Sequence, residues 1–187
     1  MQTEIINTLK ILESGGTILY PTDTVWGIGC DATNNKAVAK IFKIKNRKEQ
    51  KSLIILLDSI DEISKYVRHF PLQVKDLIHH YHKPLTVVFP DAKNLAKNLI
   101  AKDGTIAIRV VKHPFCKKLI KEFGKPLVST SANLSGNPTP NLFRDISTIL
   151  KKKVNYVVNL EQDSLNPASP STIIKVDTTG NYEILRA

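Results

Sequence analysis

The chain has 187 residues, of which 42% are hydrophobic, and its 27 Lys and Arg against 17 Asp and Glu give a formal net charge of +10. This length predicts one domain, and no apolar run of about 18 residues is present that could cross a membrane. The first residues lack the basic segment and apolar stretch of a signal peptide, and two distant cysteines, Cys30 and Cys116, argue against a disulfide framework, so a reducing, cytoplasmic compartment is expected.

The first half of the chain alternates helical and strand-like segments. Residues 3–14 place Ile5, Ile6, Leu9 and Leu12 on one helical stripe, with Thr3 as a possible cap. The elements expected next are a strand at 17–20, a loop at 21–34, a helix at 35–45, a buried strand at 53–57, a short helix beginning at Ser59 or Asp61, and a helix from Pro71 to about His82.

The second half continues the alternation. The elements expected there are strands at 85–89 and 105–111, a helix from Pro114 to Phe123 with Gly124 as its C-cap, a strand at 127–130, a loop at 131–141, a helix at 142–152, a strand at 154–159, a polar loop at 160–170, and a hairpin of 171–176 with 182–186. This order predicts a single α/β domain over residues 1–187, and the terminal hairpin predicts a mixed sheet.

The two longest expected loops, 21–34 and 131–141, are the natural places for function. The first begins with Pro21-Thr22-Asp23-Thr24, which places two hydroxyls and a carboxylate just after a strand, where α/β proteins usually bind ligands. The same residues also favour an ordinary turn. Gly27 and Gly29 follow and would let the backbone approach a ligand, although GIGC lacks the ending of a P-loop.

The second loop follows a run of short polar side chains, Ser129-Thr130-Ser131-Ala132-Asn133. So many hydroxyls at the end of a buried strand suggest a polar ligand, and turn caps are the alternative interpretation. Arg109 is a further candidate because it interrupts an apolar strand, where a charge is costly unless it is paired with an internal acid or a ligand anion.

Positive charge gathers around Lys45-Asn46-Arg47-Lys48 at the end of the second helix. Lys and Arg together suit a phosphate, but cations at a helix C-terminus are also favoured by the helix dipole. The overall charge is equally open, because a basic surface attracts nucleic acids or nucleotides while lysines spread along the chain also keep a protein soluble.

Other kinds of site are disfavoured. His79 and His82 stand three residues apart, but no nearby Cys or acidic cluster completes a zinc site. There is no G-x-S-x-G elbow for a serine hydrolase. Cys30 precedes Asp31, whose charge raises a thiol pKa, so Cys30 is expected to be a small buried residue rather than a nucleophile.

Seven strings follow one another in a specific order. They are ILYPTDTVWGIGCDAT, IFKIKNR, LIILL, TIAIRV with HP close behind it, GKPLVSTSANLSG, PSTII and ILR. This ordered set resembles the YrdC/TsaC family, the threonylcarbamoyl-adenylate synthases, over nearly the whole chain. GKPLVSTSANLSG is the most diagnostic piece, followed by the K-x-R of IFKIKNR.

The resemblance implies a fold and a reaction. The fold is a twisted mixed sheet with flanking helices and a basic concave face. The reaction condenses L-threonine, bicarbonate and ATP into threonylcarbamoyl-AMP and pyrophosphate, and the product feeds the N6-threonylcarbamoyl modification (t6A) of adenosine 37 in tRNA through separate transfer proteins. Mg²⁺ is expected to be held mainly by ATP phosphates and water, with no metal-ligating residues of the chain.

The resemblance also assigns roles by position. Lys45 and Arg47 would meet the triphosphate and act in catalysis. The expected ATP-binding set is Lys45, Arg47, Ser131, Asn133, Ser171 and Arg186. The expected threonine-binding set is Thr22, Thr24, Arg109 and Ser129.

The chain departs from the family pattern at three positions. Lys48 and Ser52 stand where prolines are usual, and Leu56 stands where many members have a histidine near the amino acid. The alternative to the synthase is a non-catalytic RNA-binding module for tRNA or ribosome maturation that uses the same basic cavity for tRNA or double-stranded RNA. RNA binding by base stacking requires exposed aromatic residues, and aromatic residues of all kinds make up only 6% of the chain.

Overall fold

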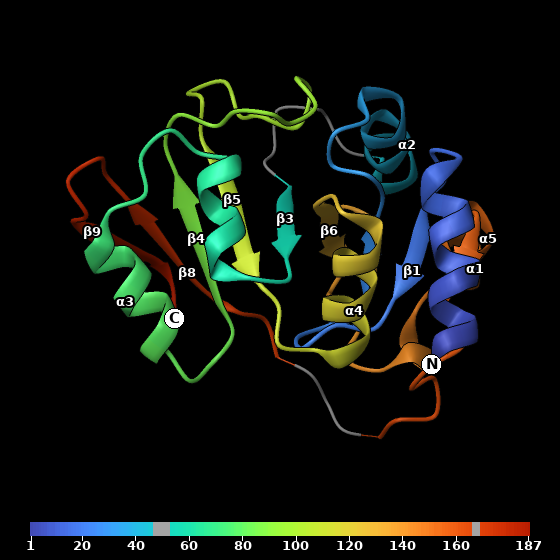
Figure 1. Ribbon diagram of the computed structural model, residues 1–187. Coiled ribbons are helices and arrows are strands. Elements are labelled where there is room, and N and C mark those ends of the chain that lie inside the picture. Colours follow the sequence, from blue (N-terminus) through green and yellow to red (C-terminus); the bar gives the residue numbers. More distant parts are fainter. Residues whose placement is uncertain (47–52, 166–168) are drawn as a thin grey trace.

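The computed structural model describes residues 1–46, 53–165 and 169–187 (Figure 1). Within these residues nine strands form one sheet in the order β7-β1-β2-β6-β3-β5-β4-β8-β9. The strands are β1 (Ile18–Tyr20), β2 (Gly27–Gly29), β3 (Ile54–Leu57), β4 (Leu85–Phe89), β5 (Ile106–Val110), β6 (Leu127–Ser131), β7 (Tyr156–Val157), β8 (Thr172–Val176) and β9 (Tyr182–Arg186). Pairs β1/β7, β3/β5 and β4/β8 are parallel and the others antiparallel, which confirms the predicted mixed α/β sheet.

Helices pack around this sheet. They are α1 (Gln2–Glu13), α2 (Asn35–Lys45), the 3-10 helix η1 (Ile60–Lys65), α3 (Leu72–His80), α4 (Pro114–Phe123), the 3-10 helix η2 (Phe143–Asp145) and α5 (Thr148–Lys153). Helix α4 begins with proline and ends at Gly124 in the left-handed conformation, as the sequence predicts. Among the described residues, no helix combines the length and apolar character needed to cross a bilayer.

The strands send alternate side chains into two apolar clusters. In β3, Ile55 and Leu57 belong to the larger cluster, which includes residues of α2, whereas Leu56 belongs to the smaller one. The smaller cluster is filled by residues of α1 and α4, which lie side by side in Figure 1. Leu56, where a family histidine was expected, is therefore a fully buried core residue.

The face that carries Leu56 changes character along the sheet. Strand register pairs Leu56 with Arg109 and Ile54 with Ser129, so these side chains share that face. Thr86 of β4 lies on it too, because Val87 is paired with Ile108. This part of the face is polar, and it forms the wall of the site described below.

Several expected elements differ in detail. Thr3 lies inside α1 and is not its cap, because the helix already begins at Gln2. The expected loop 21–34 contains strand β2, and a Cβ at Gly29 would clash with the carbonyl oxygen of Val128. Gly29 is thus required by contact between strands rather than by a ligand, which corrects the sequence interpretation of that glycine.

Two elements near the C-terminal third are shorter than expected. The predicted helix at 142–152 is divided into η2 and α5, because Ile146 and Ser147 are extended and Ile146 is buried in the core with 3% exposure. The predicted strand at 154–159 is reduced to Tyr156–Val157, which pairs only with the short strand β1. The hairpin of β8 and β9 forms as predicted.

Candidate functional site

A cavity of about 160 Å³ lies on the polar part of the sheet face. Strands β2, β6, β3, β5, β4, β8 and β9 all contribute to its wall. Its polar side chains are seven hydroxyls and two guanidinium groups, namely Thr24, Thr86, Ser129, Thr130, Ser131, Thr139, Ser171, Arg109 and Arg186. The described residues of the lining include no carboxylate, so the cavity suits an anionic ligand.

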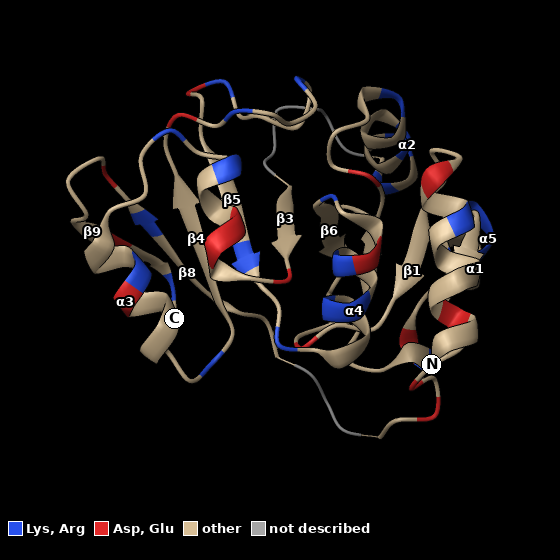
Figure 2. Ribbon diagram, viewed as in Figure 1, with Lys and Arg blue, Asp and Glu red and all other residues tan. Residues whose placement is uncertain are grey.

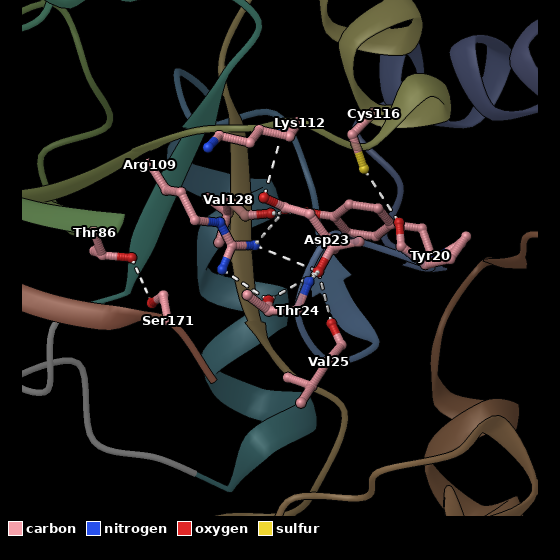
Figure 3. Close-up of polar contacts among 12 residues, drawn as sticks. Tyr20, Asp23, Thr24, Val25, Thr86, Arg109, Lys112, Cys116, Val128 and Ser171 are labelled. Atoms are coloured by element: carbon pink, nitrogen blue, oxygen red, sulfur yellow. Dashed lines mark hydrogen bonds and ion pairs between the residues drawn. The ribbon is translucent and has the colours of Figure 1, made fainter. Parts of the chain in front are cut away.

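Arg109 occupies the centre of this wall and is 3% exposed. Its guanidinium donates to Thr24 Oγ1 at 2.8 Å and to Thr22 Oγ1 at 3.4 Å, and lies 3.6 Å from Asp23 Oδ1. Figure 3 shows Arg109 reaching from β5 toward Asp23 and Thr24. The sequence pattern anticipated either an internal acid or a ligand for this arginine, and the structure supplies the acid.

The Pro21–Thr24 segment is held as a rigid turn. The hydroxyls of Thr22 and Thr24 lie 3.0 Å apart, and Thr22 Oγ1 donates to the carbonyl oxygen of Val25 at 2.8 Å. Thr22 also accepts from the backbone N–H of Thr24 at 3.1 Å. Thr22 and Thr24 therefore both stabilise the turn and accept hydrogen bonds from Arg109. The interpretation of this motif as a turn and its interpretation as part of a site are compatible.

The opposite side of the cavity is built from β4, β8 and β9. Thr86 and Ser171 share a hydroxyl hydrogen bond of 2.8 Å, drawn in Figure 3. Arg186 donates to the Ser171 carbonyl oxygen through Nε at 3.1 Å and through a terminal nitrogen at 2.7 Å. Desolvation, followed by the charge of Arg109, lowers the pKa of Arg186, so two guanidinium groups repel each other here and an anion between them would relieve that repulsion.

Lys45 stands at the edge of the cavity rather than in its wall. It is 2% exposed, and its Nζ donates to the Ser131 carbonyl oxygen at 2.6 Å and to Asn133 Oδ1 at 2.9 Å. Asn133 also accepts from Ser131 Oγ at 2.6 Å and donates to the Asn137 carbonyl oxygen at 2.5 Å. The lysine at the end of α2 thereby fixes the start of loop 131–141.

Most of the candidate residues meet in one place. Six of the ten line the cavity, namely Thr24, Arg109, Ser129, Ser131, Ser171 and Arg186. Thr22, Lys45 and Asn133 touch members of this set from outside the lining. Arg47, and with it Lys48 and Ser52, lies outside the described residues.

Several lining residues were not singled out in the sequence analysis, among them Thr86, Trp26 and Thr139. Thr86 is fully buried inside an otherwise apolar strand, and that interruption was a usable signal. Trp26 and Thr139 carried no such signal. Trp26 is the single tryptophan of the chain, and its ring packs on Phe143 with centroids 4.7 Å apart.

The cysteines and histidines form no second centre in the part of the chain that is described. Burial, together with Asp31, raises the pKa of the Cys30 thiol, and burial together with Asp23 raises that of Cys116. Helix α3 ends at His80, so His82 lies beyond it, and the described residues contain no cluster of three or more His, Cys, Asp or Glu side chains suited to a metal ion.

The positive charges outside the cavity are dispersed. Figure 2 shows Lys and Arg on α2, α3, α4 and α5 and on several loops, with acidic residues between them. This pattern fits the solvated-surface interpretation of the net charge. The specific electrostatic feature is the buried Arg109 with its neighbour Arg186.

Known proteins resemble this chain along its length. The family model for Sua5, YciO and YrdC, whose description is "Telomere recombination", matches residues 10–187. A threonylcarbamoyl-AMP synthase of Pseudoalteromonas translucida is 39% identical over 175 residues, covering 92% of each chain. One of Coxiella burnetii (strain RSA 493) is 35% identical over 188 residues, covering 98% of this chain and 97% of the relative.

Solved structures share the fold. Sua5 of P. abyssi complexed with L-threonine superposes with a TM-score of 0.85 at 26% identity, covering 97% of this chain. This chain spans 53% of that longer protein. YciO of E. coli superposes with a TM-score of 0.84 at 24% identity over the whole of this chain and 89% of its own, a likeness that concerns the fold.

Proposed function

The chain belongs to the Sua5/YciO/YrdC family, and from this premise we propose that it is a threonylcarbamoyl-AMP synthase, an enzyme that joins L-threonine, bicarbonate and ATP. The structural observation that supports this proposal most directly is the cavity, in which Arg109 and Arg186 lie among seven hydroxyl groups. Each substrate has an anionic group, namely the carboxylate of threonine, bicarbonate itself and the phosphates of ATP, and the product is an adenylate. A cationic, hydroxyl-lined cavity suits such ligands better than a flat basic surface would.

The threonine end of the site is proposed at the Arg109 wall. A guanidinium presents a planar fork that matches a carboxylate, and Arg109 is already oriented by Thr22 and Thr24. Ser129 lies on the same face, 5% exposed, and offers a further hydroxyl. We therefore keep these four residues as the threonine-binding set, and the L-threonine complex of Sua5 from P. abyssi agrees with such a ligand in the fold.

The ATP end is proposed between loop 131–141 and Arg186. Ser131 and Asn133 are positioned by Lys45, and Ser171 is positioned by Thr86 and Arg186. Lys45 would thus act on ATP partly through the loop that it fixes, and Arg47 two residues later would supply charge to the triphosphate. Lys45→Ala or Arg47→Ala is expected to impair ATP-dependent turnover, with the fold retained.

The reaction requires the protein to orient the substrates rather than to form a covalent bond with them. The amine of threonine forms a C–N bond to the carbon of bicarbonate, and one bicarbonate oxygen leaves as water, which gives a carbamate. A carbamate oxygen then attacks the α-phosphorus of ATP while pyrophosphate leaves. Holding both reactants in one cavity removes much of the entropic barrier, and fixed cations offset the charge that develops on the phosphate oxygens. No side chain needs to act as a nucleophile, in agreement with two buried cysteines of raised pKa.

Mg²⁺ is proposed to enter as the magnesium salt of ATP. The described lining offers hydroxyl oxygens and cations but no carboxylate, so its donors fit an ion whose ligands are phosphate oxygens and water. The product would be handed to the proteins that modify tRNA. We expect this to take place in the cytoplasm, where ATP and tRNA are available, and a direct contact with tRNA or double-stranded RNA remains a prediction.

The test is pyrophosphate release from ATP and Mg²⁺, with L-threonine and bicarbonate omitted one at a time. The proposal expects release only when both are present, together with an adenylate of the mass of threonylcarbamoyl-AMP. Retained ATP binding without release would contradict the synthase. RNA binding that weakens steeply with salt, in the absence of ATP binding, would support the RNA-binding module instead.

A further inference from the structure

Asp23 is a partly buried carboxylate that lies next to the cavity without lining it. Its side chain is 11% exposed and that of Arg109 is 4% exposed, with 3.6 Å between Oδ1 and the nearest guanidinium nitrogen. This distance permits an ion pair but is too long for a hydrogen bond. Among the ion pairs of the described residues, this is the one that involves Arg109, so Asp23 balances a charge that would otherwise be costly to bury.

The pair is incompletely satisfied on both sides. Asp23 Oδ1 has no hydrogen-bond partner, and Oδ2 accepts only a long bond of 3.4 Å from the backbone N–H of Lys112. Arg109 Nε is likewise buried without a partner. Each group therefore keeps hydrogen-bonding capacity that no described protein atom uses, which costs free energy.

The chain around Asp23 shows what the carboxylate does. Thr22 and Thr24 flank it and both accept from the guanidinium, so three consecutive residues hold Arg109 from one side. Figure 3 shows this side, with the Thr86–Ser171 pair across from it. Because the threonine hydroxyls are neutral, the carboxylate is the member of the segment that fixes the charged fork by electrostatic attraction.

We propose that Asp23 is a positioning residue for threonine, which orients Arg109 so that its open side meets the carboxylate of the amino acid. This inference rests on the proposed function and deepens it by naming a determinant of affinity for one substrate. Asp23 itself does not touch the substrate. Its removal acts only through Arg109.

Asp23 could neutralise the charge of Arg109 or orient its guanidinium. The two roles predict opposite changes in threonine affinity when the carboxylate is removed. If Asp23 merely neutralised Arg109, Asp23→Asn would leave a stronger positive charge and tighten threonine binding. If Asp23 orients Arg109, the same variant weakens threonine binding, because misplacing a recognition group by about 1 Å can cost up to about a hundredfold. We expect the KM for threonine to rise at least about tenfold, while the KM for ATP changes less than about twofold.

The experiment measures both KM values and, separately, threonine affinity by calorimetry for wild type, Asp23→Asn and the matched control Asp61→Asn. Asp61 of η1 pairs with Lys75 of α3, and the Asp61 side chain is 73% exposed, so the same loss of charge there is expected to leave both constants unchanged. Threoninol, which lacks the carboxylate, is expected to bind wild type and Asp23→Asn equally. A lower or unchanged KM for threonine in Asp23→Asn, or equal rises for threonine and ATP, would overturn the proposal.

Calorimetry and a second variant distinguish failure of this proposal from failure of the proposed function. Calorimetry reports on Asp23 even if turnover is absent, and failure of wild type to bind threonine would refute the site and the positioning role together. Should Asp23→Asn fail to fold, Asp23→Glu keeps the charge and moves the carboxylate by one methylene. A selective rise in the KM for threonine would then support the proposal, and parallel rises for both substrates would refute it.

Discussion

One face of the sheet carries two regions of opposite character. At β1 and the far end of β3, the face is covered by α1 and α4, and its side chains, such as Tyr20 and Leu56, are fully buried in an apolar cluster. At β5 and β4 the same face presents Arg109 and Thr86 to the cavity. The change occurs within β6, where Leu127 belongs to the apolar cluster and Ser129, two residues later, lines the cavity.

This difference shows how the fold makes room for a ligand. A helix layer over one region provides the stability of a packed core, whereas the other region leaves polar groups that a ligand must satisfy. Substitutions in the two regions should therefore affect different properties. Those in the region covered by α1 and α4 should change stability, and those at the cavity should change substrate affinity.

The largest expected effect follows from Arg109→Met in the cavity. Removing Arg109 from its proposed hydrogen-bonded charge pair with the threonine carboxylate costs about 4 kcal/mol, which corresponds to close to a thousandfold lower kcat/KM for threonine. The KM for ATP should change much less. Steady-state kinetics would check this against the exposed control Arg68→Met. Equal losses for both substrates would move Arg109 from the threonine site to the nucleotide site or to the structural core.

Under the helices, Leu119→Ala in α4 should act on stability alone. Leu119 is fully buried, and truncation of a buried leucine costs about 3 kcal/mol through lost transfer free energy and a residual cavity. Denaturant unfolding measures this loss, and both KM values should stay within about twofold of wild type. A large rise in either KM would mean that the two regions are coupled.

Lys45 anchors the start of loop 131–141 at the edge of the cavity, and Lys45→Met should affect both properties. The Ser131 carbonyl oxygen and Asn133 Oδ1 would lose a buried charged donor, at a cost of about 2 kcal/mol in the free energy of unfolding. The KM for ATP should rise with it, because loop 131–141 loses its anchor. Lys43→Met, at an exposed position of the same helix, is the control. Unchanged stability and ATP affinity in Lys45→Met would refute this role.

The smallest expected effect comes from Ser171→Ala at the far side of the cavity. It removes the hydroxyl bond to Thr86 but keeps the carbonyl that accepts from Arg186, so a cost of about 1 kcal/mol, or a few-fold in the KM for ATP, is expected. Kinetics with ATP as the varied substrate measures it, beside the exposed Ser14→Ala variant. A loss as large as that of Arg109→Met would place Ser171 at the reacting centre.

The sequence predicted local features well where local physics decides them. Pro114 and Gly124 mark the ends of α4 because proline suits the first turn and glycine the left-handed cap. Strand β2 was missed because its glycines follow from close contact with β6, which lies far away in the sequence, and with Tyr20 of the neighbouring strand β1.

The same limit applied to the site. Arg109 was identified from a charge in an apolar strand, but its three partners became visible only when β5 and residues 22–24 were brought together by the fold. The roles given to Lys45 and Asn133 came from resemblance, and the loop contact that joins them depends on a separation of 88 residues. Sequence spacing carries no information about such contacts.

The most direct test of the central claim is to map ligand binding onto the two regions by backbone amide chemical shifts in NMR spectra, with ATP, Mg²⁺ and L-threonine added in turn. The account predicts that threonine shifts the amide signals of Thr24, Arg109 and Ser129, and that ATP shifts those of Ser131 and Ser171. The amide signals of Leu12 in α1 and Leu119 in α4 should stay unchanged. Shifts concentrated on α1 and α4, with none at the cavity, would contradict it.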